Sequence, residues 1–388
     1  MVDEAQGTLP TSVWHPDSVA RIVEGQPHVI PHIRRSDLVD ILPDFDLWDM
    51  WPVQNVDGTT ARFEGWSLWL MLSAPLQPDP ESRHHRARIR LVTERDGVWK
   101  DCGNLLPDTA NPGSREWAGS ALFDPASGRL TLFYTAAGMR GEPKPTVAQR
   151  LFQLSAQLRV TDGTASTVGW TEPMESVCSD GHHYVIVGAV EGLPGAIKGF
   201  RDPAHFRDPA TGAGYLFFTG SLQSSASDWN GVIGVARAAN AYHDSWALLP
   251  PVLSADGLNN ELERPVMIAR DGLYYLFWST QRKVFAPGVS GPNGLYGVVG
   301  ESPLGPFSPL NGTGLVAANP ADAPFQSYSW WVTSDLTVRG FADLIGVSDT
   351  DAIVDDPEWR RRHFAGGPAP VFRLHLEGDR ASVIAEAE

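Results

Sequence analysis

The feature that most constrains the fold of this chain is a unit that recurs five times along it. Each unit has a short motif, an apolar strand, an Asp-containing turn, and a second strand rich in aromatic and branched residues. The second strands begin roughly 60 to 85 residues apart, more than the 40 to 50 that a compact four-stranded repeat needs. Long connecting loops would supply the excess. The units begin at Trp48, Glu116, Phe200, Glu263 and Tyr328.

Five antiparallel units, none able to bury both of its faces alone, predict an all-β fold, a five-bladed β-propeller around a central channel. The 38 Gly, 31 Pro and 14 Trp favour many short strands joined by tight turns. A two-sheet sandwich would explain the strands but not the recurring order. Residues 1–388 are expected to form a single catalytic propeller domain. The segment of about 1–40 would pack on it through a short helix capped by Ser18.

The charge balance excludes several partners. A formal charge of −16 opposes non-specific binding to nucleic acid or to anionic membrane surfaces. Cys102 and Cys178 form no C-x-x-C pair, and the His84-His85 and His182-His183 pairs lack zinc-site spacing, so no metal is expected. The first ten residues lack the basic and apolar regions of a signal peptide.

The tripeptide Arg-Asp-Pro occurs twice within residues 200–209. When the third unit is aligned with the others, Asp208 falls in a turn series with Asp57, Asp124 and Asp271, and local hydrogen bonding explains it. Asp202 falls instead at the front of the first strand of its unit. We therefore predict that Asp208 is structural and that Asp202 is functional.

Three carboxylates, Asp49, Asp202 and Glu263, begin three equivalent strands. In a propeller the equivalent ends of the innermost strands meet at one mouth of the channel, so these residues are expected to be neighbours. The alternative is that they only cap strand ends or pair with Arg201 and Arg264. A close pair of carboxylates can cleave a glycosidic bond with retention, one attacking the anomeric carbon while the other protonates the leaving oxygen.

Tryptophan residues occur in the same sequence motifs, two of them next to or near Asp49. Trp48, Trp51 and Trp117 suit the lining of a sugar pocket, because the apolar face of a sugar ring packs on an indole. Each of them is also a common core residue.

At these residues the sequence resembles glycoside hydrolase family 68, the levansucrases, inulosucrases and bacterial β-fructofuranosidases. "LWDMWPVQ" at 47–54 is similar to the family's nucleophile segment and "FRDP" at 200–203 to its stabiliser motif. "ELERP" at 261–265 resembles the general-acid segment. "EWAGS" at 116–120 and "SGPNGLYGVV" at 290–299 resemble two further family blocks.

The resemblance implies a five-bladed propeller with a funnel-shaped active-site pocket that acts on sucrose without a cofactor. By matching position, Asp49 would be the nucleophile, Asp202 the transition-state stabiliser and Glu263 the acid and base. Glucose would leave, and fructose would pass to water, sucrose or a small sugar acceptor. The residues expected in the substrate pocket are Trp48, Trp117, Arg201, Glu261, Arg264, Gln281 and Tyr328.

Three positions depart from the family pattern. Ala118 replaces a serine that supports the nucleophile, and Asn260 replaces an aspartate that contributes to a calcium site in some members. Gln281 stands at a rim position that is commonly Arg or His in polymer-forming members, which favours hydrolysis and short fructo-oligosaccharides over long fructan. The resemblance implies an extracellular location, with a cytoplasmic one as the alternative; the oligomeric state stays open.

Two other functions compete with this prediction. A related furanosidase acting on fructans or arabinans would share the three carboxylates. A non-catalytic sugar-binding propeller would not need an acid and nucleophile pair, so the presence of all three carboxylates argues against it.

Overall fold

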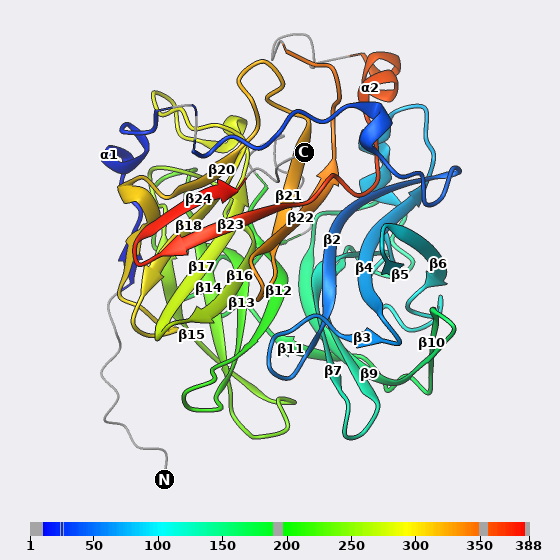
Figure 1. The fold of residues 1–388 in the computed structure, drawn as a ribbon. Coiled ribbons are helices and arrows are strands. Elements are labelled where there is room, and N and C mark those ends of the chain that lie inside the picture. The colour runs from blue at the N-terminus through cyan, green and yellow to red at the C-terminus, as the bar shows by residue number, and fades with distance from the viewer. Residues whose placement is uncertain (1–10, 24, 26, 189–196, 349–355, 385–388) are drawn as a thin grey trace.

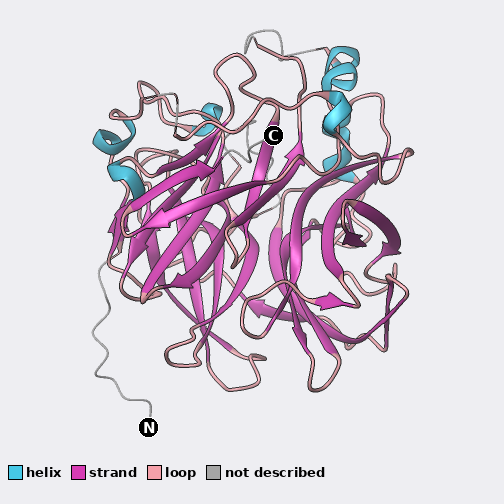
Figure 2. Ribbon diagram, viewed as in Figure 1, coloured by secondary structure: helices cyan, strands magenta, loops and turns pink. Residues whose placement is uncertain are grey.

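The computed structural model describes residues 11–23, 25, 27–188, 197–348 and 356–384, and the described chain is built mainly of β-strands (Figure 2). The strands follow one another as antiparallel meanders around a common centre (Figure 1). This arrangement confirms the predicted all-β propeller class.

Within the described residues the strands fall into four hydrogen-bonded sheets, which can be followed as five antiparallel meanders because one sheet contains two of them. The first has β2 (Phe45–Asn55), β3 (Arg62–Phe63), β4 (Trp66–Pro75), β5 (Arg88–Arg95) and β6 (Val98–Asn104). The second has β7 (Arg115–Asp124), β8 (Arg129–Ala137), β9 (Gln149–Thr161), β10 (Thr164–Val168) and β11 (Met174–Val177). The third has β12 (Phe200–Arg207), β13 (Gly214–Ser221), β14 (Gly231–Ala238) and β15 (Trp246–Ser254).

The fourth and fifth meanders complete the fold. The fourth has β16 (Glu263–Arg270), β17 (Leu273–Thr280), β18 (Gly294–Gly300), β19 (Phe307–Pro309) and β20 (Leu315–Ala318). The fifth has β21 (Ser327–Val332), β22 (Thr337–Ala342), β23 (Phe372–Glu377) and β24 (Arg380–Ile384).

The first strands of the meanders line the centre. β2 contacts β7, β7 contacts β12, β12 contacts β16, β16 contacts β21, and β21 contacts β2, so these strands form a closed ring. β2 and β7 also pair in parallel, from Val53 opposite Ala121 to Asn55 opposite Phe123, which joins the first two meanders into one sheet. The front ends of all five first strands therefore meet at one end of the ring.

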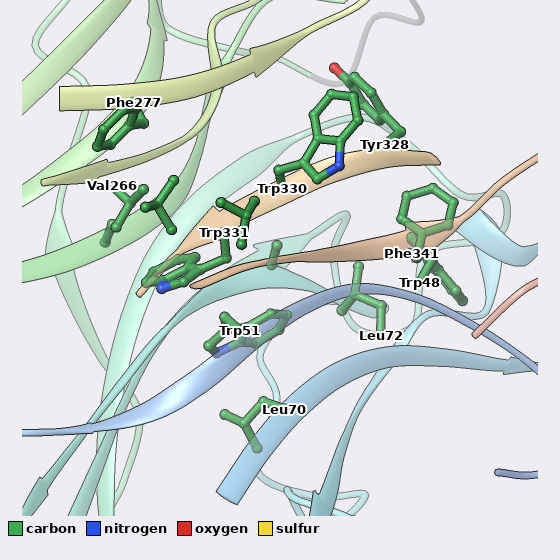
Figure 3. Close-up of a cluster of buried hydrophobic side chains, with 14 of the residues drawn as sticks. Trp48, Trp51, Leu70, Leu72, Val266, Phe277, Tyr328, Trp330, Trp331 and Phe341 are labelled. Carbon is green, nitrogen blue, oxygen red and sulfur yellow. The ribbon is translucent and has the colours of Figure 1, made fainter. Parts of the chain in front are cut away.

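Aromatic side chains fill the space between the meanders. Figure 3 shows Trp51 of β2 in one cluster with Val266 of β16 and Trp331 of β21. Trp51 has no exposed surface and Trp331 is 1% exposed. A buried aromatic side chain removes roughly 150–250 Å² from water, which corresponds to about 4 to 6 kcal/mol of transfer free energy. Trp51 therefore packs in the core, the alternative that the sequence left open for it.

The turns between first and second strands hold the predicted aspartates. Asp208 accepts hydrogen bonds from the Ala210 amide at 3.0 Å and the Thr211 hydroxyl at 2.5 Å. Asp124 repeats the pattern with the Ala126 amide and the Ser127 hydroxyl. The carboxylate in each case closes its own turn, as the internal alignment predicts.

The N-terminal segment packs on the propeller through β1 (Ser12–Val13), which pairs in parallel with β15. The Trp14 side chain is fully buried and contacts the rings of Trp278 and Tyr296. The predicted helix is shorter than expected, because α1 covers only Pro16–Val19 and His15 is its N-cap. The prediction of Ser18 as the cap is wrong: proline at the first helical position starts the helix before it.

Short helices connect the strands elsewhere: η1 (Arg35–Asp37), η2 (Pro80–His85), η3 (Arg282–Val284), η4 (Leu310–Gly312) and α2 (Pro357–His363). Among the described residues, none of the helices has the length and apolar character needed to cross a bilayer.

Candidate active site

Each first strand is interrupted by a β-bulge near its front end. The register shifts between Trp48 and Met50 in β2, between Arg201 and Ala204 in β12, and between Glu263 and Val266 in β16. β7 and β21 shift at the corresponding places. A bulge re-aims side chains and often lies beside an active site. The residues at the shifts include Asp49, Ala118, Asp202, Arg264 and Ser329.

Four of these bulge residues adopt left-handed backbone conformations, which are unfavourable for residues other than glycine. The φ angles are +42° at Asp49, +61° at Asp202, +52° at Arg264 and +60° at Ser329. The surrounding structure must hold each of them in this conformation. Strain of this kind, repeated at one level of the ring, indicates a site whose side-chain directions matter.

The bulges correct the predicted register of the three carboxylates. Asp49 and Asp202 stand at the bulge, where the fourth strand has Arg264. Glu263 stands one residue earlier, level with Trp48 and Arg201. The three acids therefore begin equivalent strands, as expected, but they occupy two different registers, because a bulge shifts the pairing within each strand. All three nevertheless come from the front ends of ring strands.

Arg201 contacts three acidic residues of the predicted site. Its guanidinium donates to Glu261 at 3.0 Å and to Glu263 at 2.9 Å, and it lies 3.6 Å from Asp202. Burial lowers the pKa of Arg201, but the negative charges of Glu261, Glu263 and Asp202 outweigh burial and raise this pKa. The ion pairs with Arg201 that the alternative interpretation requires are thus present, and one buried arginine brings together Asp202, Glu261 and Glu263.

Asp202 is 7% exposed, and its Oδ2 accepts a 3.1 Å hydrogen bond from the Thr219 hydroxyl. Burial raises the pKa of Asp202 to about 6, although the Arg201 charge works in the opposite direction. A carboxylate in such surroundings interacts strongly with any positive charge that develops nearby.

Arg264 lies between Asp49 and the fifth strand. Its guanidinium donates to the Ser329 hydroxyl at 2.6 Å and to the Met50 carbonyl at 2.7 Å, and it lies 4.0 Å from Asp49 Oδ1. Burial raises the pKa of Asp49, while the Arg264 charge and a hydrogen bond from Ser329 lower it. Asp49 is therefore held next to a fixed positive charge.

Solvent reaches two of the three acids. The side chain of Asp49 is 22% exposed and that of Glu263 is 18% exposed. The second oxygen of Glu263 accepts a hydrogen bond from the Tyr328 hydroxyl, and burial together with the Glu263 charge raises the pKa of Tyr328. Asp49 and Glu263 are thus accessible acids beside a more deeply buried third acid.

The remaining predicted residues lie around this centre. Trp48 is 1% exposed and packs against Arg83 and His84 of η2, whereas Trp117 is half-buried. Gln281 is half-buried at the start of η3, directly after Thr280, whose hydroxyl donates to the Glu261 carbonyl.

Sequence reasoning missed a second layer of charged residues. The charge of Arg83 acts on Asp49, and that of Lys283 of η3 acts on Glu261. Burial raises the pKa of Asp343, which follows β22, to about 7. These residues lie outside the motifs that carry the repeat, and only their charge could have drawn attention to them.

The comparisons with known proteins come from sequence and from structure. A family described as levansucrase/invertase matches residues 4–226 and 222–388. Levansucrase LscA of Pseudomonas savastanoi pv. glycinea is 29% identical, covering 96% of this chain and 94% of that protein. A levansucrase of Zymomonas mobilis is 29% identical over 97% of this chain and 91% of its own length.

Two solved structures are also similar to this chain. An inulosucrase from Halalkalicoccus jeotgali bound to kestose is 36% identical, with a TM-score of 0.88 over 96% of this chain and 95% of that one. A levansucrase from Gluconacetobacter diazotrophicus, 23% identical over 98% of this chain and 90% of that one, has a TM-score of 0.79 and shares the fold.

Proposed function

Because this chain belongs to the levansucrase/invertase family of fructosyl-transferring glycoside hydrolases, we propose that it cleaves sucrose with retention through a covalent fructosyl-aspartate intermediate. Residues 1–388 would act as one catalytic unit. The observation that carries this proposal is the convergence of acids from β2, β12 and β16 on two buried arginines.

In the first step Asp49 attacks the anomeric carbon of the fructosyl group, and the bond to the glucosyl oxygen breaks as Glu263 protonates that oxygen. In the second step Glu263 removes a proton from water or a sugar hydroxyl, whose oxygen then displaces Asp49. The partial exposure of Asp49 and Glu263 supports these two roles.

Asp202 would stabilise the positive charge that develops on the sugar ring. Its burial supports this role, because a charge in a low-dielectric site stabilises a nearby transition-state charge more than it would in water. Arg264 would keep Asp49 ionised, since it lies 4.0 Å from the nucleophile and is itself buried.

The substrate pocket would be completed by neighbours of these acids. Glu261 and Arg201 support hydroxyl recognition through their shared ion pair, and Tyr328 is hydrogen-bonded to Glu263. Trp48, Trp117, Arg264 and Gln281 would contribute to the same pocket. The ligands would be sucrose and small sugar acceptors.

Matched carboxamide variants test the catalytic roles. Asp49→Asn should reduce sucrose cleavage by several orders of magnitude, because an amide cannot form the covalent intermediate.

Glu263→Gln should lose far more activity on sucrose than on a fructosyl donor with a good leaving group, which needs little protonation. Equal losses on both donors would remove Glu263 from the acid role. Activity on fructans or arabinans without activity on sucrose would favour a related furanosidase.

For the products, we propose hydrolysis and short fructo-oligosaccharides. Gln281 carries no charge, so it would hold a growing fructan less firmly than Arg or His would. Gln281→Arg should therefore shift the products of concentrated sucrose toward longer chains, measured by chromatography. Arg282→Gln, at the neighbouring exposed position, is the matched control. Abundant high-mass fructan from the unmodified enzyme would contradict this proposal.

A further inference from the structure

Behind Glu261, the ammonium group of Lys198 lies among three oxygen atoms from two separate segments. Lys198 Nζ donates to the Asp228 carbonyl at 2.5 Å, to Asn230 Oδ1 at 2.8 Å and to Asn260 Oδ1 at 3.2 Å. Three acceptors match the three donors of an ammonium group. The charge of Lys198 thus joins the loop before β14 to the segment that leads into β16.

Asn260 continues this network toward the catalytic acids. It is 1% exposed, and its amide donates to Glu261 Oε1 at 3.3 Å. The other oxygen of Glu261 accepts from Arg201, which also donates to Glu263. Lys198 is therefore linked to the proposed acid through three intermediate side chains.

The charges around Lys198 suit an ammonium ion. Burial lowers the pKa of Lys198, while the negative charges of Asp228 and Glu261 raise it. The acceptors are a carbonyl and two amide oxygens, and Asn230 and Asn260 are both buried.

The calcium ion that some members of the family hold with an aspartate at position 260 does not fit the residues of this chain. A calcium ion bound by these three oxygens would lie about 2.3 to 2.6 Å from each of them, in the space that Lys198 Nζ already fills. The three oxygens also include no carboxylate, and no cluster of three or more His, Cys, Asp or Glu side chains suited to a metal occurs in the described residues.

We propose that Lys198 is a positioning residue whose ammonium group serves as a built-in cation, holding Asn260 and Glu261 and, through Arg201, the proposed acid Glu263. This inference rests on the proposed function. It makes the orientation of the acid independent of a bound metal ion.

The kinetic test compares two lysines that each bridge separate segments. Lys198→Met keeps the length of the side chain but removes its charge and all three hydrogen bonds. We expect kcat on sucrose to fall about tenfold while KM changes less than about twofold, because the variant disturbs the groups that orient the acid. Lys198→Arg, which keeps the charge, should recover part of the loss.

Lys100→Met is the matched control. Lys100 is also half-buried and donates to the Asp162 carbonyl, but it packs on Trp66 far along the first meander from the acids. It should lower Tm without changing kcat. An unchanged kcat for Lys198→Met would overturn the proposal, and so would an equal loss in Lys100→Met. If Lys198→Met does not fold, Asn230→Ala, which removes one acceptor of the ammonium group, takes its place with the same expectations.

A metal-binding test keeps this inference separate from sucrose cleavage. The double variant Lys198→Ala/Asn260→Asp removes the ammonium group and adds a carboxylate, so millimolar Ca²⁺ should raise its Tm. The Tm of the unmodified protein should not respond to Ca²⁺ or to a chelator. A fall in its Tm on chelation, or a double variant that ignores Ca²⁺, would overturn the assignment of a cation site. Failure to cleave sucrose would refute the proposed function alone.

Discussion

The two Arg-Asp-Pro copies, at 201–203 and 207–209, share a sequence but not an environment. Asp202 lies at a bulge in the central ring with a φ of +61°, beside the buried Arg201. Asp208 lies in the turn that ends the same strand, where it closes the turn and accepts a 2.6 Å hydrogen bond from Tyr274. The first copy therefore lies at the front end of β12, beside the proposed catalytic acids, and the second lies at the other end of the same strand.

Electrostatics separates the copies further. Burial raises the pKa of Asp202 to about 6. Burial also acts to raise the pKa of Asp208, yet hydrogen bonds from Thr211 and Tyr274 outweigh it and lower this pKa. Arg201 is surrounded by three carboxylates, whereas Arg207 is exposed. The folded structure therefore disfavours the ionised form of Asp202 and favours the ionised form of Asp208, although both lie in the same tripeptide.

The largest expected difference between the copies is catalytic. Asp202→Asn should reduce kcat/KM on sucrose by about 10²- to 10³-fold, because it removes a charge proposed to stabilise the transition state. Asp208→Asn should stay close to wild type, since asparagine also suits a turn. Steady-state kinetics on sucrose would measure kcat/KM for both variants. Equal losses at the two sites would show that the comparison is wrong.

The arginines should differ by a smaller factor. Arg201→Lys should lower kcat/KM about 10- to 100-fold, because one ammonium group cannot reproduce the planar contacts to Glu261 and Glu263. Arg207→Lys at the exposed position is the matched control and should leave the kinetics unchanged. If both variants kept full activity, Arg201 would not organise the site.

The smallest effect concerns stability, and it has opposite signs at the two aspartates. The folded pKa of Asp202, about 6, lies above the unfolded value of about 4, so ionising Asp202 costs stability as pH rises through this range. Asp202→Asn should therefore melt about 1 to 3 °C higher than wild type at pH 7 and match it near pH 4.

Asp208 has a lowered pKa, so it contributes stability at neutral pH that is lost as pH falls through its folded pKa. Asp208→Asn should melt below wild type at pH 7, and the gap should close in acid. Melting curves of both variants across this pH range would measure the two signs. A common sign would contradict the assigned environments.

Much of the fold could be predicted because it depends on local pattern. The strand and turn order of five units indicated the propeller, and the Asp-Gly turns marked the strand ends. The position of Asp208 followed from that order alone. Helix α1 was placed wrongly, because four residues carry too little periodicity to locate a cap.

The sequence by itself determined the all-β architecture, the turn role of Asp208 and the approach of Asp49, Asp202 and Glu263, because each depends on strand order. Only the tertiary structure decided the bulges that put Glu263 one residue out of register, the burial of Trp51, and the bonds of Lys198 to Asn230 and Asn260. Those features arise from contacts between segments distant in sequence, where packing and desolvation depend on neighbours that no local pattern specifies.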